Sequence, residues 1–250
     1  MRANGIESIA KIPDDVKLTE QQAIIRNVYR TGHPYISSEL KLALRPFGPP
    51  ACYLDFETMS PAIPLYPGTR PYERLPFQWS LHKLDKNGDL QHSGFLADGG
   101  VDAREAFSET LLEKLASSTG PIIVYSSFER STLNQLANVL KRHRKAIERI
   151  TARLCDLLAI MREHVYYADF GGSYSIKAVG PVIAPNISYD DLDHVSDGGA
   201  AASAFERIAA GRCDGDDNIL RRALEEYCRR DTLAMVEIHS RLAKITAHRR

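Results

Sequence analysis

Two acidic residues lie two positions apart in the apolar segment Tyr53-Leu54-Asp55-Phe56-Glu57-Thr58. On a strand, Asp55 and Glu57 would point to one face, whereas Leu54 and Phe56 would point to the other. Paired carboxylates are electrostatically costly unless a cation lies between them, and oxygen ligands of this kind suit Mg²⁺ or Mn²⁺. The same short pattern also fits a strand end at which two acids simply face water.

A second pair of polar residues lies near the C-terminus, in Tyr227-Cys228-Arg229-Arg230-Asp231. In a helix, residues four positions apart share one face, so Tyr227 and Asp231 would meet the same volume. The Asp231 carboxylate could then complete a metal site, and the Tyr227 phenol could contact a water molecule there. The alternative is a core tyrosine together with an aspartate that pairs with a neighbouring arginine.

A third acid, Glu129, follows Phe128 just after the apolar segment Pro121–Tyr125. It would begin a helix at the carboxyl end of a strand, where α/β proteins tend to place their sites. A helix N-terminus also favours an acidic side chain for purely structural reasons. Asp156 and Asp169 are the spare acids that would replace Glu129 if its side chain pointed away.

The three groups occur in the order of the three DEDD exonuclease motifs, and together they resemble the tyrosine subclass of that superfamily. The resemblance implies a ribonuclease H-like fold and a two-metal-ion mechanism with Mg²⁺ or Mn²⁺. The metal ligands that it implies are Asp55, Glu57, Glu129 and Asp231. Tyr227 would orient the attacking water, because a phenol with a pKa of about 10 is a poor free base at neutral pH. The implied activity is 3′–5′ exonucleolytic hydrolysis of single-stranded DNA or RNA.

A closer resemblance covers almost the whole chain and rests on four segments: Leu54–Thr58, Pro76–His82, Asp169–Lys177 and Tyr189–Leu192. These segments resemble domain of unknown function 2779, an uncharacterised bacterial family assigned to the same fold. That family often follows a RecB-like or Cas4-like nuclease region. The resemblance therefore implies such a domain or protein as a partner, besides nucleic acid bound as a single strand or a 3′ end. Glu129 departs from the wider superfamily, whose middle motif usually supplies aspartate, but it resembles the closer family.

Four segments predict the strands that must position these acids: Cys52–Phe56, Leu75–Asp85, Gln91–Ala97 and Pro121–Tyr125. The segment Lys86–Asp89 contains Asn-Gly, which tolerates the positive φ angles of a tight hairpin turn. Helices are predicted over Ala103–Ala116, Ser127–Arg149, Leu154–Glu163, Ser175–Val182, Gly198–Ala210 and Asp216–Ala247. This order indicates an α/β fold with three antiparallel strands, parallel strands beside them, flanking helices and a helical C-terminal half.

Residues 1–50 differ from the rest of the chain and predict two short helices before a proline-rich break at Arg45–Pro50. Thr19 is a suitable cap for the first helix, and the second is expected around Ser38–Leu44. We interpret this region as a helical arm on the main domain or as the remnant of an upstream domain. Residues 51–250 would then form the ribonuclease H-like exonuclease domain.

Aromatic and small residues beside the acids are candidate substrate contacts. Phe56, Thr58 and Met59 follow the proposed metal strand and could line a pocket for the terminal nucleotide. Either Met59 or Phe128 could act as a wedge against a base. For Phe56, packing in the core is the alternative.

A long loop follows the first strand, and its length of 15 residues (60–74) is unusual for a connection without structure of its own. Loops of this kind are often functional. Arg70 and Arg74 lie in it and are candidate phosphate contacts.

The composition indicates a globular protein, with 44% hydrophobic residues, 26% charged residues and a net charge of zero. This balance excludes the strongly basic signature of a protein that coats nucleic acid, but it suits an enzyme that holds a phosphodiester through metal ions. The four cysteines form no CxxC pair, so the sequence indicates neither a zinc site nor a disulfide framework; they are Cys52, Cys155, Cys213 and Cys228. The sequence shows no signal peptide and no apolar run of about 20 residues, so we expect a cytoplasmic protein without membrane contact.

The main alternative function is a catalytically silent module that binds nucleic acid or a protein partner on the same fold. The presence of Asp55, Glu57 and Asp231 argues against it, because clustered acids without a use repel one another and destabilise a fold. A nuclease that cuts within a strand would differ only in how its channel is closed. The sequence leaves open the choice between DNA and RNA and the oligomeric state.

Overall fold

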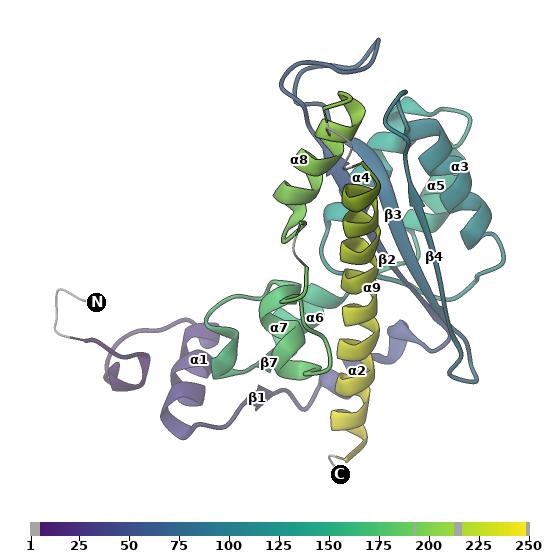
Figure 1. Cartoon of the computed structure of the whole chain (residues 1–250). Helices are drawn as coiled ribbons and strands as arrows, with labels where there is room; N and C mark the ends of the chain where they lie inside the picture. The colour runs from purple at the N-terminus through teal and green to yellow at the C-terminus, as the bar shows by residue number, and fades with distance from the viewer. Residues whose placement is uncertain (1–5, 193, 213–216, 249–250) are drawn as a thin grey trace.

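The central strand of the molecule is β2 (Ala51–Met59), which carries the first two acids and lies inside a five-stranded sheet (Figure 1). The computed structural model describes residues 6–192, 194–212 and 217–248. Across the sheet the strands are β4 (Leu90–Leu96), β3 (Leu75–Leu84), β2, β5 (Ile122–Val124) and β6 (Leu154–Asp156). The pairs β2–β3 and β3–β4 are antiparallel, whereas β2–β5 and β5–β6 are parallel. The expected mixed sheet is confirmed.

The hairpin between β3 and β4 forms at the predicted Asn-Gly turn. Gly88 has a φ of 94°, a conformation that glycine adopts without steric cost. Oδ1 of Asp85 accepts hydrogen bonds from the amides of Asn87 (2.7 Å) and Asp89 (2.9 Å). The side chain therefore satisfies backbone donors that the turn leaves unpaired.

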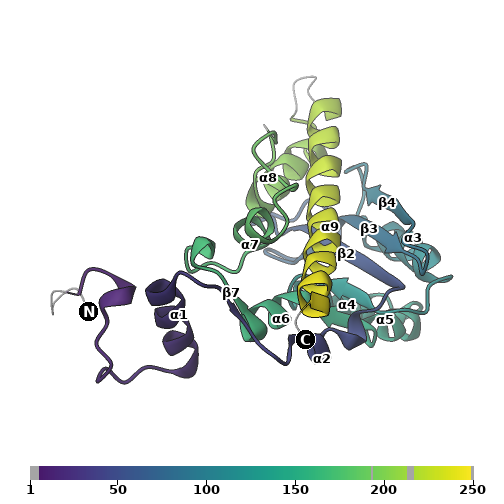
Figure 2. The same ribbon diagram turned by 90° about the horizontal axis from the view of Figure 1, so that it is seen from below.

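One face of the sheet is covered by α3 (Arg104–Leu115), α4 (Phe128–Val139) and α5 (Arg144–Thr151) (Figure 2). Leu54 and Phe56 point into this layer, where both are buried. Phe107 of α3 packs edge-on against Phe56, with ring centroids 4.9 Å apart. Burial of these side chains from water supplies the driving force that holds the three helices on the sheet.

The opposite face is covered by the long helix α9 (Asp217–His248), together with α7 (Ile176–Ile183) and α8 (Gly198–Ala209). Two separate apolar clusters form there. Near the start of β2, Tyr53 packs with Met235 of α9, and near its end Met59 packs with Phe205 of α8. Asp55 lies on the same face between these two clusters, because alternate residues of a strand share one face. A polar position therefore separates the two apolar clusters.

Two helix predictions are wrong in detail. The segment 127–149 is not one helix, because Leu140 leaves the helical region (φ −93°, ψ 74°) and separates α4 from α5. Leu154 begins strand β6 instead of a helix, since residues 154–156 pair with β5. The following helix α6 (Leu157–His164) starts where the Asp156 side chain accepts a 3.2 Å hydrogen bond from the Ala159 amide.

The N-terminal region has two parts: residues 6–31 form an arm that extends away from the sheet, whereas Leu40, Leu44 and Phe47 are buried in a core cluster with residues of α9 (Figures 1 and 2). Its main helix α1 (Glu20–Thr31) begins with the predicted cap, because Thr19 and Gln22 exchange side-chain-to-backbone hydrogen bonds. Short strand β1 (Tyr35–Ile36) pairs with β7 (Val165–Tyr166) and joins the arm to the main body. The remaining short elements are η2 (Ile9–Lys11), α2 (Leu40–Ala43), η3 (Arg45–Phe47) and η4 (Ala168–Phe170).

Some sequence expectations fall on residues outside the described ranges. These are residues 1–5 of the arm, Cys213, and Asp216 at the expected start of the last helix. The other three cysteines are free thiols. Within the ranges described, no helix combines the length and apolar character needed to cross a membrane.

Candidate metal centre

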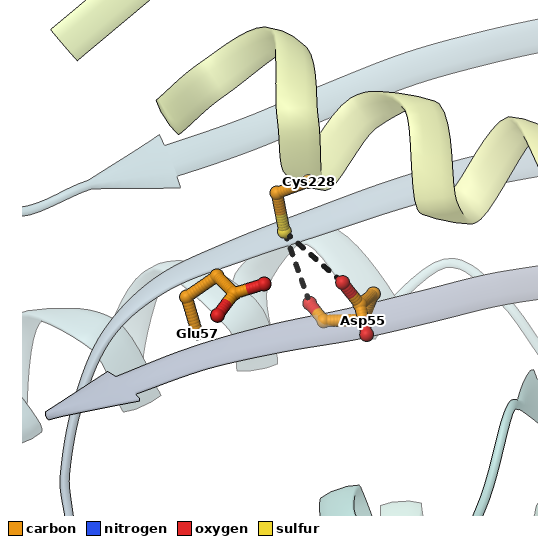
Figure 3. A group of neighbouring side chains, drawn as sticks. All are labelled: Asp55, Glu57 and Cys228. Carbon is orange, nitrogen blue, oxygen red and sulfur yellow. Dashed lines mark hydrogen bonds between the residues drawn. The ribbon is translucent and has the colours of Figure 1, made fainter. Parts of the chain in front are cut away.

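Asp55 and Glu57 both project from β2 toward α9, as the strand pattern predicts (Figure 3). In the register of the β2–β3 pair, Asp55 lies opposite Ser80 and Glu57 lies opposite Gln78. The β2–β3 pairing becomes irregular directly after Glu57, and irregularities of this kind re-aim side chains next to active sites. Glu57 is only 7% exposed although it carries an ionisable group. A buried carboxyl at this position needs a compensating partner.

A thiol on α9 faces the two carboxylates. Sγ of Cys228 lies 3.4 Å from Oδ2 of Asp55 and donates a hydrogen bond to it (Figure 3). Burial, followed by the charges of Asp55 and Glu57, raises the pKa of the Cys228 thiol well above its usual value. Cys228 is therefore a neutral donor near pH 7. The sequence did not single it out, because an isolated cysteine in a helix is typical of core packing.

Glu129 enters the same space from the first turn of α4. The chain reaches it through Ser126, a non-glycine residue with a φ of 143°, and such strained residues cluster at functional sites. Oγ of Ser126 accepts a 3.1 Å hydrogen bond from the Phe128 amide and so fixes the start of the helix. The Glu129 carboxyl is 3% exposed and hydrogen-bonds with Asp55, while its Oε2 has no partner among the described residues.

Asp231 completes the group from α9, one helical turn after Tyr227. The Tyr189 hydroxyl donates a 2.6 Å hydrogen bond to Oδ1 of Asp231. The Tyr227 phenol also hydrogen-bonds with this carboxyl, as its helical spacing predicts. Tyr189 was absent from the predicted site, although it lies in one of the segments that carry the family resemblance.

The four carboxyl groups act on one another electrostatically. Burial raises the pKa of Glu57 to about 8, and Asp231 and Glu129 add to the rise. Burial likewise raises the pKa of Glu129 to about 8 and the pKa of Asp231 to about 6. The pKa of Asp55 lies well above its usual value because of burial and because its carboxyl faces Asp231, Glu57 and Glu129. We call these four residues the carboxylate cluster.

Two charged neighbours of the carboxylate cluster were not predicted. Nζ of Lys177, on α7, lies 4.6 Å from the centre of the Tyr227 ring and 5.6 Å from that of Tyr189. Asp197 caps α8 by accepting a 2.8 Å hydrogen bond from the Ala200 amide. The Lys177 ammonium group opposes the rise in the pKa of Glu57, whereas the Asp197 carboxylate adds to it.

The donor set fits a divalent cation that prefers oxygen ligands. Carboxyl oxygens of Asp55 and Glu57 lie within 4.8 Å of one another and of the Cys228 sulfur, and a cation held by the two carboxylates would offset the repulsion among the clustered acids. Glu105, Glu109 and His143 form another acidic group of similar spacing on the other side of the sheet. Arg142 already pairs with both of those glutamates, so their charge is compensated without a metal.

About half of the chain, which includes three of the four acids, matches a known protein family. Residues 52–175 match the model of the family described as Domain of unknown function (DUF2779). The expected resemblance to this family is thereby confirmed for that stretch. The DUF2779 segment contains Asp55, Glu57 and Glu129, whereas Tyr227 and Asp231 lie beyond its end.

Two curated relatives are known only as uncharacterised proteins. Uncharacterized protein MG366 of Mycoplasma genitalium is 24% identical to this chain over 205 residues. Uncharacterized protein MG366 homolog of Mycoplasma pneumoniae is 24% identical over 208 residues. Each alignment covers 74% of this chain but 31% of the relative, so the chain spans about a third of the length of these relatives. No solved structure matches the chain.

Two of the predicted substrate contacts in the DUF2779 segment are core residues. Phe56 is 2% exposed and lies on the face of the sheet opposite the carboxylate cluster. The prediction that Phe56 contacts substrate is therefore wrong. Met59 is also 2% exposed and packs with Tyr66 in the cluster near α8, which leaves it no surface to act as a wedge. Strand alternation gives Phe56 the opposite face to its two acidic neighbours.

The other predicted contacts lie nearer the surface. Phe128 is half-buried, and the guanidinium carbon of Arg74 lies 4.7 Å from the centre of its ring. Arg74 also donates a 3.2 Å hydrogen bond to Oγ of Ser131. Thr58 is half-buried directly after Glu57, and Arg70 is exposed in the loop that precedes β3. The phenylalanine and Arg74 form one contact pair next to Glu129.

The spare acids differ in their relation to the site. Asp169 is exposed on η4, and no contact places it with the carboxylate cluster. Asp156 is close enough for its charge to raise the pKa of Glu129 further, although burial is the main cause of that rise. Its side chain caps α6. The geometry therefore favours Glu129 as the fourth carboxyl group.

Proposed function

We propose that this chain is a metal-dependent 3′–5′ exonuclease that hydrolyses phosphodiester bonds of single-stranded DNA or RNA. The observation that carries the proposal is the convergence of four carboxyl groups with Tyr227 on one face of the central strand. They come from three separate elements, β2, α4 and α9, in the order that the DEDD motifs require. Glu57, Glu129 and Asp231 are buried and Asp55 is half-buried, and such a set of acids is difficult to explain unless a cation compensates them.

The topology supports a ribonuclease H-like assignment within this proposal. The first two acids lie on the central strand, with the antiparallel hairpin strands on one side and the parallel strands on the other. The third acid follows β5, directly next to β2 in the sheet, at the carboxyl end where α/β proteins place their sites. The fourth is supplied by the helix that crosses β2.

Two divalent ions, Mg²⁺ or Mn²⁺, would be held by the carboxylate cluster. When bound, such ions generate the nucleophile and stabilise the leaving oxygen of a phosphodiester. Asp55, Glu57, Glu129 and Asp231 would supply the oxygen ligands. The unpartnered Oε2 of Glu129 is the acceptor that is available for this purpose.

The two tyrosines beside Asp231 would have different roles. Burial and the neighbouring acids raise the pKa of both phenols well above their usual range, so each stays protonated at neutral pH. Each therefore acts as a hydrogen-bond donor and not as a base. Tyr227 would orient the attacking water, and Tyr189 would hold the Asp231 carboxylate in position.

Substrate would approach past the Phe128–Arg74 pair. A half-buried aromatic ring beside a guanidinium group can stack on a base and contact a phosphate. Arg70 and Thr58 are the further candidates for substrate contacts. A RecB-like or Cas4-like nuclease domain remains a proposed partner, and the greater length of the relatives leaves room for additional domains.

The alternative is a silent module that binds nucleic acid or a protein partner. Such a module would gain stability from the loss of any one buried acid, because like charges in a low-dielectric site repel strongly. The presence of four carboxyl groups together with two phenolic donors therefore favours catalysis.

The test is cleavage of end-labelled single-stranded DNA and RNA with Mn²⁺ or Mg²⁺, beside an EDTA control. Asp55→Asn removes the carboxylate that faces the other three acids, and Asp169→Asn serves as the matched control at an exposed acid. We expect a ladder that shortens from the 3′ end, is lost with EDTA and with Asp55→Asn, and persists with Asp169→Asn. Absence of both cleavage and Mn²⁺ binding by calorimetry would reject the exonuclease and leave the binding module.

A further inference from the structure

Lys177 brings an ammonium group to the edge of the carboxylate cluster. It is the second residue of α7, a helix whose N-cap Ser175 accepts a 3.3 Å hydrogen bond from the Ala178 amide. The half-buried side chain reaches across to α9, where Nζ lies 4.6 Å from the centre of the Tyr227 ring. The centre of the Tyr189 ring lies 5.6 Å from the same Nζ.

The position of the ammonium group is fixed from two directions. Nζ donates a hydrogen bond to the carbonyl oxygen of Ser196, in the segment that leads into α8. That segment is itself anchored, because Val195 is 1% exposed and Asp197 caps α8. Contacts with two aromatic rings and one carbonyl oxygen hold the lysine near the cluster instead of letting it extend into water.

The lysine charge acts on two of the proposed metal ligands. Burial raises the pKa of Glu57 and of Asp231, and Lys177 lowers both values in opposition to it. Both tyrosines that touch the ammonium group also hydrogen-bond with Asp231. The lysine, the two phenols and the two acids therefore form one connected group.

We propose that Lys177 is a built-in counter-ion that shares Glu57 and Asp231 with the divalent cations of the site. This inference rests on the proposed function, since it concerns the same metal centre. The ammonium group favours the ionised forms of the two acids when no cation is bound. Its contacts with Ser196 and the two tyrosines hold it there when a cation enters, so the two positive charges repel each other across the acids that they share.

The consequence is that Lys177 limits the affinity of the cluster for metal ions while it supports the metal-free fold. Loss of its charge should therefore have opposite effects on two measurements. The metal-free protein should become less stable, and the binding of a divalent cation should become tighter. A lysine that only tethers Ser196 would instead lower stability by the same amount with or without metal.

The test compares two variants at this position. Lys177→Gln removes the charge but keeps a donor for Ser196, whereas Lys177→Arg keeps the charge. Lys145→Met, at an exposed position on α5, controls for the loss of a surface charge. Mn²⁺ binding is measured by calorimetry, and the thermal midpoint is measured in EDTA and in saturating Mn²⁺.

We expect Lys177→Gln to bind Mn²⁺ with a Kd lower by roughly three- to tenfold, a range set by partial screening of the lysine charge. Its thermal midpoint should fall in EDTA, and the difference from the parent protein should shrink in saturating Mn²⁺. Lys177→Arg and Lys145→Met should match the parent protein in Kd.

An unchanged or weaker Mn²⁺ affinity for Lys177→Gln would overturn the counter-ion role and leave the metal centre standing. An equal loss of thermal midpoint in EDTA and in Mn²⁺ would also overturn it, because that result identifies a structural tether. Failure of the parent protein to bind Mn²⁺ would instead reject the metal centre itself and this inference with it.

Discussion

The hydroxyl group of Tyr189 donates a 2.6 Å hydrogen bond to Oδ1 of Asp231. This contact joins the segment before α8 to the middle of α9 and gives Asp231 a second phenolic donor beside Tyr227. A carboxylate that receives two donors is held in one orientation, and its charged form is favoured. The site therefore positions its C-terminal acid with one tyrosine from each of two separate elements.

Tyr189→Phe should weaken metal binding more than Tyr227→Phe does. The loss of a hydrogen bond to a charged group costs about 1.5–3 kcal/mol, which corresponds to a Kd for Mn²⁺ higher by roughly tenfold or more. Tyr227→Phe should mainly lower kcat, because its proposed partner is the attacking water. Calorimetry with Mn²⁺ and single-strand cleavage separate the two effects.

The control for this comparison is Tyr29→Phe, whose hydroxyl bonds with the Ala168 carbonyl oxygen away from the cluster. It should leave both Kd and kcat unchanged. Equal Mn²⁺ affinity for Tyr189→Phe and the parent protein would show that Asp231 does not depend on this donor.

The core of the site could be predicted from the sequence because it follows local periodicity. Strand alternation placed Asp55 and Glu57 on one face, and helical spacing placed Tyr227 and Asp231 together. Glu129 followed from its position after a buried strand. These rules need no knowledge of how distant segments pack, so the structure reproduces each arrangement.

The residues that surround the carboxylate cluster depend on tertiary packing and could not be predicted from local periodicity. Tyr189, Lys177 and Cys228 reach the cluster only because α7, α8 and α9 fold over the same face of the sheet. No spacing rule links residues in separate helices. The misassigned start at Leu154 has a similar cause, since a three-residue strand is stabilised by its pairing with β5 and not by its own pattern.

Two phenylalanines next to acids should respond differently to truncation. Phe56→Ala removes a core ring that packs against Phe107, and such changes typically cost about 3–5 kcal/mol of unfolding free energy. Phe128→Ala removes a half-buried ring with one cation–π contact, which contributes about 0.5–1 kcal/mol. Denaturant unfolding measures both values.

For KM the larger effect should come from Phe128 and not from Phe56. Phe128→Ala should raise KM for single strands, whereas Phe56→Leu, which keeps an apolar core residue, should leave KM unchanged. A KM effect from Phe56→Leu of equal size would restore Phe56 as a substrate contact.

Cys228 should act as a hydrogen-bond donor and not as a metal ligand. Burial raises the pKa of its thiol well above the usual value, and a protonated thiol is a poor ligand. Cys228→Ser keeps the donor to Asp55 and should retain Mn²⁺ affinity, whereas Cys228→Ala should weaken it. The measurement is Mn²⁺ calorimetry on both variants, and a loss of affinity in Cys228→Ser would identify direct ligation.

The metal-free protein should lose stability as pH rises. The pKa of Glu57 is raised by burial from 4.5 to about 8, and the same holds for Glu129. A carboxyl group with a raised pKa contributes stability that is fully present below its unfolded value and is lost as pH increases through its folded value. In EDTA, the thermal midpoint should therefore fall across the interval from 4.5 to about 8.

Saturating Mn²⁺ should reverse much of this trend, because cations bind the ionised carboxylates and their binding releases protons. The difference in thermal midpoint between Mn²⁺ and EDTA should thus widen as pH rises. Glu57→Gln removes one of the titrating groups and should flatten the EDTA curve, while Glu109→Gln, at an exposed residue of α3, should not. If the EDTA curve of the parent protein is as flat as that of Glu57→Gln, the carboxyl groups are ionised without a cation and the electrostatic argument for a metal centre fails.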